Sequence, residues 1–250
     1  MMSRNENCFW RKNVFHLLSL TLLSLLPVVV ILSWIVSIYV DDSVNNLLGS
    51  NGIRWMVSSM VNNIYCSPLA GVVVFLISLS VLYESGLIST LMTLVRERKW
   101  SDGSLSLKKR RALMLSVGVV EVLLVLFVIL MLFPGSILYT AFGTYENSAL
   151  QQGWYGMLGL SAILVGNVFG YSSGGFVSSD DFMHAHTSLL SKCSWYFLYL
   201  CLAAEFVAFL DYSLMTPYVV VSVLSYILYY CPLLYITYMV MCGDDLENDV

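Results

Sequence analysis

Charged residues are scarce in this 250-residue chain, where they make up 11% of the sequence. Soluble domains carry about 25%. Hydrophobic residues account for 58% of the chain, and its mean hydropathy is +0.79. A chain with so few charges and so many apolar residues would not stay dissolved in water. We therefore expect its surroundings to be lipid. The net charge of −4 is less informative, because in a membrane protein the positions of the charges matter more than their sum.

The motifs of common catalytic, metal and cofactor sites are also missing. The sequence has no H-E-x-x-H and no phosphate-binding loop, and its cysteines form no C-x-x-C pair that would indicate zinc or redox chemistry. Residues 170–174 match G-x-S-x-G, but a nucleophile elbow needs a preceding strand and an apolar run stands there instead. His184 and His186 are two apart and would face different ways on a helix. We therefore predict no enzyme activity, no cofactor and no metal.

Long apolar runs are the main feature that is present. A bilayer core about 30 Å thick needs roughly 20 helical residues, and about six runs qualify: 14–40, 68–95, 112–133, 154–171, 195–210 and 218–241. The first follows Arg11 and Lys12, as a signal peptide would, but it is too long and lacks a cleavage site. We expect an uncleaved helix there. The predicted fold class is all-α, a polytopic membrane helix bundle forming a single transmembrane domain over residues 1–250.

A shorter segment between the first two spans is amphipathic. Its apolar residues follow helical spacing: Ile53, Met56, Val57, Met60, Val61 and Ile64. Arg54, Ser58, Ser59, Asn62 and Asn63 take the other face. The segment 53–64 is too short to span a bilayer, so we predict an interfacial helix.

Lysine and arginine are concentrated in segments that six spans place on one side of the membrane. They precede the first span, fill the basic loop 96–111 and recur at Lys192, and the opposite side holds only Arg54. The positive-inside rule makes the basic side cytoplasmic, so both termini are predicted to be cytoplasmic. The acidic tail 244–249 weighs little in this rule.

Two glutamates lie inside predicted spans, Glu121 in the third and Glu205 in the fifth. At about 1.5 Å per residue both carboxyls lie roughly 14–15 Å deep. An ionisable group at that depth is costly and indicates a function, here a proton- or cation-coupling pair. The alternative is two neutral carboxyls that hydrogen-bond to neighbouring helices and hold them together. Asn167 and the interruption at Ser85 and Gly86, where we expect a kink or break, complete the candidate polar pathway.

Small residues recur four apart in and after the fourth span. They are Ala162, Gly166, Gly170 and Gly174. Such a stripe lets another helix approach closely, so we predict a role in helix packing. Residues 178–181, Ser-Ser-Asp-Asp, indicate the start of a further helix, with a hydroxyl cap and acidic residues at the positive end of the helix dipole.

Four separate stretches carry a more specific signal. They read VNNLLGSNGIRW at 44–55, ESGLI at 84–88, GYSSGGFVSSDD at 170–181 and LAAEFVAF at 202–209. In this order they resemble the LL-x-x-x-GIRW, SGL, YG…G-x-x-x-SD-x-D and AAQF-x-AYF motifs of the AbgT family, the p-aminobenzoyl-glutamate transporters. The resemblance covers most of the chain, about 21–95 and 112–215.

The resemblance implies a bacterial inner-membrane protein that carries out proton-coupled transport of an aminobenzoyl-glutamate-like anion or an antimetabolite. Family members are about twice as long, and their two helical hairpins are missing here, at the basic loop and after Asp211. Glu205 also replaces the glutamine of the AAQF motif. The family's substrate site is therefore not carried over.

A non-transporting membrane scaffold or interaction module derived from the same fold is the alternative to transport. Under either hypothesis the lipid bilayer is one expected partner. The other is a second copy in a homodimer, as the family resemblance implies, or another membrane protein. No nucleic-acid partner is expected.

Overall fold

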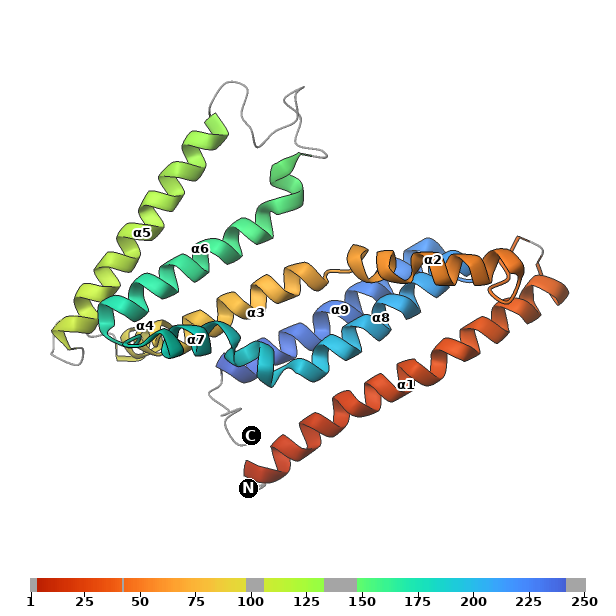
Figure 1. Ribbon diagram of the computed structural model, residues 1–250, viewed down its shortest axis with the longest axis horizontal. Coiled ribbons are helices and arrows are strands. Elements are labelled where there is room, and N and C mark those ends of the chain that lie inside the picture. The colour runs from red at the N-terminus through yellow and green to blue at the C-terminus, as the bar shows by residue number, and fades with distance from the viewer. Residues whose placement is uncertain (1–3, 42, 98–105, 133–147, 242–250) are drawn as a thin grey trace. The chain divides into compact units, whose positions relative to one another are not determined.

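The computed structural model describes residues 4–41, 43–97, 106–132 and 148–241 (Figure 1). These ranges contain helices and connecting turns and no strand, which confirms the predicted all-α fold. The helices are α1 (Arg4–Tyr39), α2 (Ser50–Cys66), α3 (Leu69–Glu84), α4 (Leu87–Glu97), α5 (Leu107–Leu132), α6 (Ala149–Ser173), α7 (Ser179–Lys192), α8 (Ser194–Ser213) and α9 (Tyr218–Met241).

Within the described residues, six helical stretches are long and apolar enough to cross a membrane, as expected of a multi-pass membrane protein. They are Phe15–Tyr39, Ser50–Glu84, Leu107–Leu132, Gly153–Ser173, Ser194–Ser213 and Tyr218–Tyr238. The second differs from the predicted 68–95, because it joins α2 to α3, and α3 ends at Glu84 before α4 begins at Leu87. With 16 residues, α3 alone is shorter than the roughly 20 that a span needs. The interfacial position of α2 stays a prediction.

Part of the predicted basic loop is helical. Residues 96–97 end α4, and 108–111 form the first turns of α5. Residues 98–105 of this loop and the acidic tail 244–249 lie outside the described residues.

The helices form two compact units, and each is described here by itself. Unit 1 comprises residues 1–70 and 193–250, and unit 2 comprises residues 71–192. In unit 1, helices α1, α2 and α9 all pack against α8. The core of unit 1 contains the buried side chains of Val29, Leu47, Leu210 and Val221. The N-terminal part of α1 adds an aromatic contact, in which the Phe15 and Trp195 rings lie 4.1 Å apart.

The connector 43–49 between α1 and α2 ties three helices of unit 1 together. Asn45 donates from its backbone to the Ser213 carbonyl (3.0 Å) and from its side chain to the Tyr212 carbonyl (2.8 Å), both on α8. The N–H of Leu47 donates to Ser33 Oγ of α1 at 3.1 Å. The connector also lies against Gly52 of α2, where a Cβ would collide with the backbone of residues 46–47.

Helix α9 of unit 1 contains a proline whose missing N–H is compensated by its neighbour α8. Pro232 cannot donate to the carbonyl of Leu228, four residues earlier. The Tyr199 hydroxyl donates to that carbonyl at 3.1 Å, and the Tyr196 hydroxyl donates to the next one, Tyr229, at 2.8 Å. A side chain of α8 therefore satisfies a backbone group that α9 cannot satisfy itself, as lipid requires.

In unit 2, α6 contacts α3 through glycines. The Ser78 hydroxyl donates to the Gly159 carbonyl at 3.0 Å, and a Cβ at Gly159 would collide with Val74. One heptad later, a Cβ at Gly166 would lie 2.8 Å from Val81 Cγ1. Helix α5 also packs on α6, and these two helices share with α4 a core of Leu87, Ala112, Leu113 and Phe169.

Candidate functional site

The carboxyl of Glu205 is buried in unit 1 between α8 and α2. The side chain is 9% exposed, and its Oε2 accepts from Asn63 Nδ2 at 3.1 Å. Its other oxygen, Oε1, is buried and has no hydrogen-bond partner among the described residues. Cys201 lies one turn earlier on the same helix. The site therefore has one satisfied oxygen and one open to a proton or a donor group.

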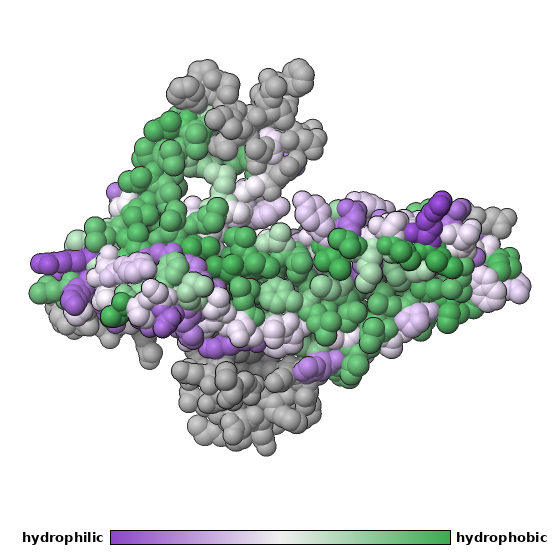
Figure 2. Space-filling model, in the orientation of Figure 1, coloured by the Kyte–Doolittle hydropathy of each residue, from purple (hydrophilic) through white to green (hydrophobic). Residues whose placement is uncertain are grey.

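Glu121, the second predicted carboxyl, has a different environment. Its side chain is exposed on α5, where the buried residues are Ala112, Leu113 and Ser116, all in the first part of the helix. Beyond its basic first turns, the face of α5 visible in Figure 2 is mainly hydrophobic. The structure places Glu121 in unit 2 and Glu205 in unit 1, and the two are not brought together within either unit.

Asn167, predicted as a polar partner, lies on α6 opposite His186 of α7. Asn167 Nδ2 and His186 Nε2 are 3.4 Å apart, and His186 Nδ1 lies 2.7 Å from the Phe182 carbonyl oxygen. The Oδ1 atom of Asn167 is buried and without a hydrogen-bond partner in the described part of the chain. The predicted polar pathway residue thus contacts a histidine of unit 2, and neither glutamate of the predicted pair.

Ser85 and Gly86 form the turn between α3 and α4, where the sequence indicates a kink or break. Gly86 has φ +77°, a conformation that favours glycine, and its carbonyl accepts from the Thr90 hydroxyl at 2.8 Å. Ser85 is buried, and its hydroxyl donates to the Leu82 carbonyl at 3.2 Å. The hydroxyls of Ser85 and Thr90 therefore both donate to backbone carbonyls of the same turn.

The residue before this turn, Glu84, connects α3 to α7. Its Oε1 accepts from the Ser188 hydroxyl at 2.8 Å. Ser80, one turn earlier on α3, accepts from the backbone N–H of Leu189 at 3.2 Å. These contacts hold α7 against the end of α3.

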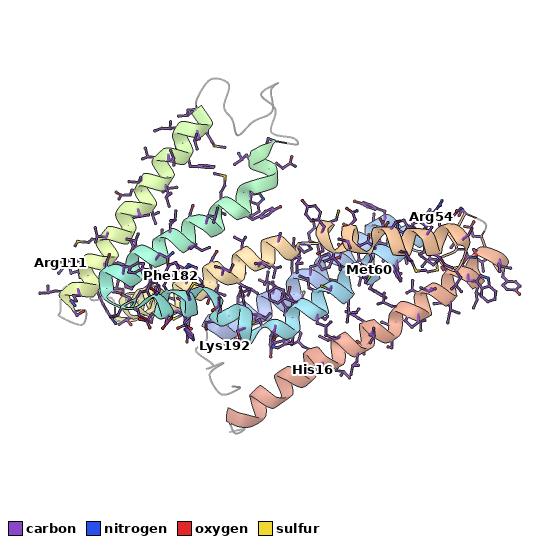
Figure 3. The ribbon with its side chains drawn as sticks, in the orientation of Figure 1. His16, Arg54, Met60, Arg111, Phe182 and Lys192 are labelled. Atoms are coloured by element: carbon purple, nitrogen blue, oxygen red, sulfur yellow. The ribbon has the colours of Figure 1, made fainter. Side chains whose placement is uncertain are left out.

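The start of α7 is capped by reciprocal hydrogen bonds. The Ser178 hydroxyl accepts from the Asp181 N–H at 3.1 Å, and Asp181 Oδ2 accepts from the N–H groups of Ser178 (2.9 Å) and Val177 (3.0 Å). The bonds from Ser178 and Val177 to the carboxylate lower the pKa of Asp181 below its usual 3.8. Figure 3 marks Phe182 and Lys192, which lie near the two ends of this helix.

The four residues of the small-residue stripe lie in different environments. Gly166 contacts Val81 of α3, as described above, whereas a Cβ at Gly170 would collide with the Phe176 ring. Gly174 ends α6 with φ +80° and has open space around it, and Ala162 is half-buried. Gly159, outside the predicted stripe, makes the closest contact with α3.

Among the described residues, no group of three or more histidine, cysteine or acidic side chains could hold a metal ion. The candidate polar sites are therefore the carboxyl of Glu205 in unit 1 and the Asn167–His186 pair in unit 2. His186 was missed as part of a site because its partner lies on another helix. Comparisons with protein-family models, curated proteins and solved structures gave no match.

Proposed function

We propose that this chain is a proton-coupled membrane transporter of AbgT-like descent, with Glu205 as its coupling carboxyl. The observation that carries the proposal is the buried, half-satisfied carboxyl of Glu205 in a membrane-spanning helix. Such groups are expensive in a bilayer and are kept where a proton or ion pathway needs them. The four stretches that resemble AbgT motifs support the same lineage and include the helix that carries Glu205.

In this mechanism the proton binds at Oε1 of Glu205. The other oxygen keeps its bond from Asn63 in either protonation state, so the carboxyl stays oriented while its charge changes. A neutral carboxyl is stable in an apolar surrounding and a carboxylate is not, so proton loss favours an arrangement in which water or a cation reaches the site. The cargo suggested by the resemblance is an aminobenzoyl-glutamate-like anion or an antimetabolite.

The orientation and membrane belong to the same proposal. Residues 108–111 at the start of α5 and Lys192 at the end of α7 are basic, whereas Arg54 on α2 is on the opposite side of the predicted topology. Both termini are then cytoplasmic, and the membrane is the bacterial inner membrane.

Uptake of radiolabelled p-aminobenzoyl-glutamate into proteoliposomes, with and without an inward proton gradient, tests the proposal. We expect gradient-dependent uptake that falls at least about 10-fold in Glu205→Gln, a change that keeps the Asn63 bond but cannot carry a proton. Asp211→Asn, the same type of change at an exposed position of α8, is the matched control and should leave uptake unchanged. Glu121→Gln, at an exposed side chain, should have a smaller effect. Absence of uptake by folded wild-type protein, or full uptake by Glu205→Gln, would overturn the proposal.

A second candidate function, a non-transporting membrane module that acts by association, is favoured by helix α5. Its exposed face carries Glu121 among apolar side chains that include Val117, Val122, Leu124 and Val125. A carboxyl on such a face is better tolerated against another protein than against lipid. Subunit counting by photobleaching in nanodiscs tests this candidate: a stable dimer that dissociates in Glu121→Leu supports association, and a monomer at all protein densities excludes it. Because a transporter of this lineage is also expected to dimerise, the uptake assay above distinguishes the two functions.

A further inference from the structure

The pair formed by His186 and Asn167 in unit 2 has a hydrogen-bond pattern that defines the state of the imidazole. The half-buried ring of His186 lies with Nδ1 at 2.7 Å from the Phe182 carbonyl oxygen and with Nε2 at 3.4 Å from Asn167 Nδ2. A carbonyl oxygen only accepts, so Nδ1 carries the hydrogen. Nε2 of the neutral ring is then an acceptor, which matches the amide donor of Asn167.

The amide oxygen of Asn167, Oδ1, makes no hydrogen bond within the described residues. This atom is also buried. A rotation of the amide about its last torsion exchanges Oδ1 and Nδ2. The rotation breaks no bond to Oδ1, and it places an acceptor where the donor to His186 was. In the new position Nδ2 takes the place that Oδ1 leaves.

We propose that His186 and Asn167 form a proton-binding site between α7 and α6. A proton from water adds to the Nε2 lone pair, both ring nitrogens then donate, and the Asn167 amide rotates so that Oδ1 accepts from Nε2–H. One residue thereby provides the donor for the neutral ring and the acceptor for the charged ring, so proton binding does not expel the histidine. This site belongs to unit 2 and is distinct from the Glu205 carboxyl of the proposed function.

The charged and titratable groups around the pair come from each element that contacts it. On α3, the carboxyl of Glu84 bonds to Ser188, two residues after His186. On α7, Asp181 lies near the start of the helix and His184 is exposed. On α6, the Tyr171 ring stacks on Phe182, which in turn lies 4.1 Å from the His186 ring.

Nitrogen NMR of protein labelled at both histidine and asparagine, in detergent micelles, tests the site, because the chain has only three histidines to assign, His16, His184 and His186. Single His→Gln changes assign the signals. At about pH 8 we expect His186 in the Nδ1–H tautomer. Between about pH 8 and pH 5, where histidine titrates, the side-chain amide signal of Asn167 should change with the same midpoint as His186. An Nε2–H tautomer at high pH, or an amide signal that does not follow His186, would overturn the proposal.

A charge-placing variant gives an independent test. Asn167→Asp offers only acceptor oxygens at the same position, so the His186 midpoint should rise by about 1 pH unit or more. His184→Gln is the matched control on the exposed face of α7 and should leave the tautomer of His186 unchanged. An unchanged midpoint in folded Asn167→Asp contradicts the proposal. If this variant does not fold, the tautomer and the coupled amide signal of the wild type decide.

Discussion

The two units of the molecule join their helices in different ways. In unit 1, the connector 43–49 hydrogen-bonds to α1 and α8, and tyrosine hydroxyls of α8 bond to backbone carbonyls of α9. In unit 2, α6 approaches α3 through Gly159 and Gly166, and α7 is held by bonds between side chains. Lipid is as apolar as the helix surfaces, so helices associate through close packing and hydrogen bonds. Unit 1 depends more on backbone hydrogen bonds, and unit 2 on the small size of glycine.

The largest effect is expected at the contact that allows the connector of unit 1 to approach α2. In Gly52→Ala the new methyl group meets the backbone of residues 46–47, which cannot rotate away, so unfolding should become easier by about 3 kcal/mol. Gly49→Ala, with a nearest contact of 3.3 Å and an ordinary negative φ, is the matched control. Denaturant titration in micelles measures the stability. Amide exchange shows whether the loss is confined to α1, α2 and α8, and equal loss in unit 2 would contradict the separation of the units.

A smaller loss is expected at the glycine contact of unit 2. Gly159→Ala places a methyl group against the Val74 side chain, which is stiff because it is β-branched, and should cost about 1–2 kcal/mol. Gly156→Ala, one turn earlier on α6 with nothing within 4 Å, should cost nothing. The same denaturant titration compares the two variants. If both are equally stable, close approach of α6 and α3 is not what holds unit 2 together.

The hydroxyl of Tyr199 should matter less, and only while Pro232 is present. Tyr199→Phe leaves the Leu228 carbonyl without a donor and should cost about 1 kcal/mol. In a Pro232→Ala background the backbone N–H of residue 232 can serve that carbonyl, so the same change should cost little. A double-mutant cycle on the free energy of unfolding measures this coupling, and strict additivity would show that the bond does not compensate for the proline.

The smallest effect concerns the cap of α7 in unit 2 and its dependence on pH. The pKa of Asp181 is lowered by N–H donors, so its contribution is present above about pH 4 and is lost as the pH falls through the lowered value. The protection of the Val177 and Ser178 amides, measured as their exchange rate relative to an unstructured peptide at the same pH, should fall at acid pH, and in Asp181→Asn it should already be low at neutral pH. Asp180→Asn, its neighbour, is the control and should behave as wild type.

The sequence predicts individual helices well because lipid constrains each of them separately. Most backbone groups of a spanning helix are satisfied within that helix, so the length of an apolar run is enough to identify it. The run 195–210, for example, lies within α8, and the interruption at Ser85 and Gly86 coincides with the turn between α3 and α4. The second span is the exception. It was predicted at 68–95, which covers α3 and α4, whereas the apolar stretch of the structure runs over Ser50–Glu84 and covers α2 and α3.

The environment of each polar side chain could not be predicted in the same way. Glu121 and Glu205 have the same predicted depth, yet one is exposed on α5 and the other is buried against α2. The difference depends on which helices meet, and Asn63 is 142 residues from Glu205 in the chain. The bond between Ser188 and Glu84 likewise spans 104 residues. Periodicity and composition act over single helices and carry no information about such pairs.

The carbonyl left free by Pro232 also affects how the chain is made. If α9 entered the bilayer alone, it would expose the Leu228 carbonyl to hydrocarbon, at a cost of several kcal/mol. Helix α8 precedes α9 in the chain, so the Tyr199 hydroxyl has already been synthesised when α9 arrives. We expect the two helices to leave the insertion machinery as a pair, because Pro232 makes the stability of α9 in lipid depend on α8.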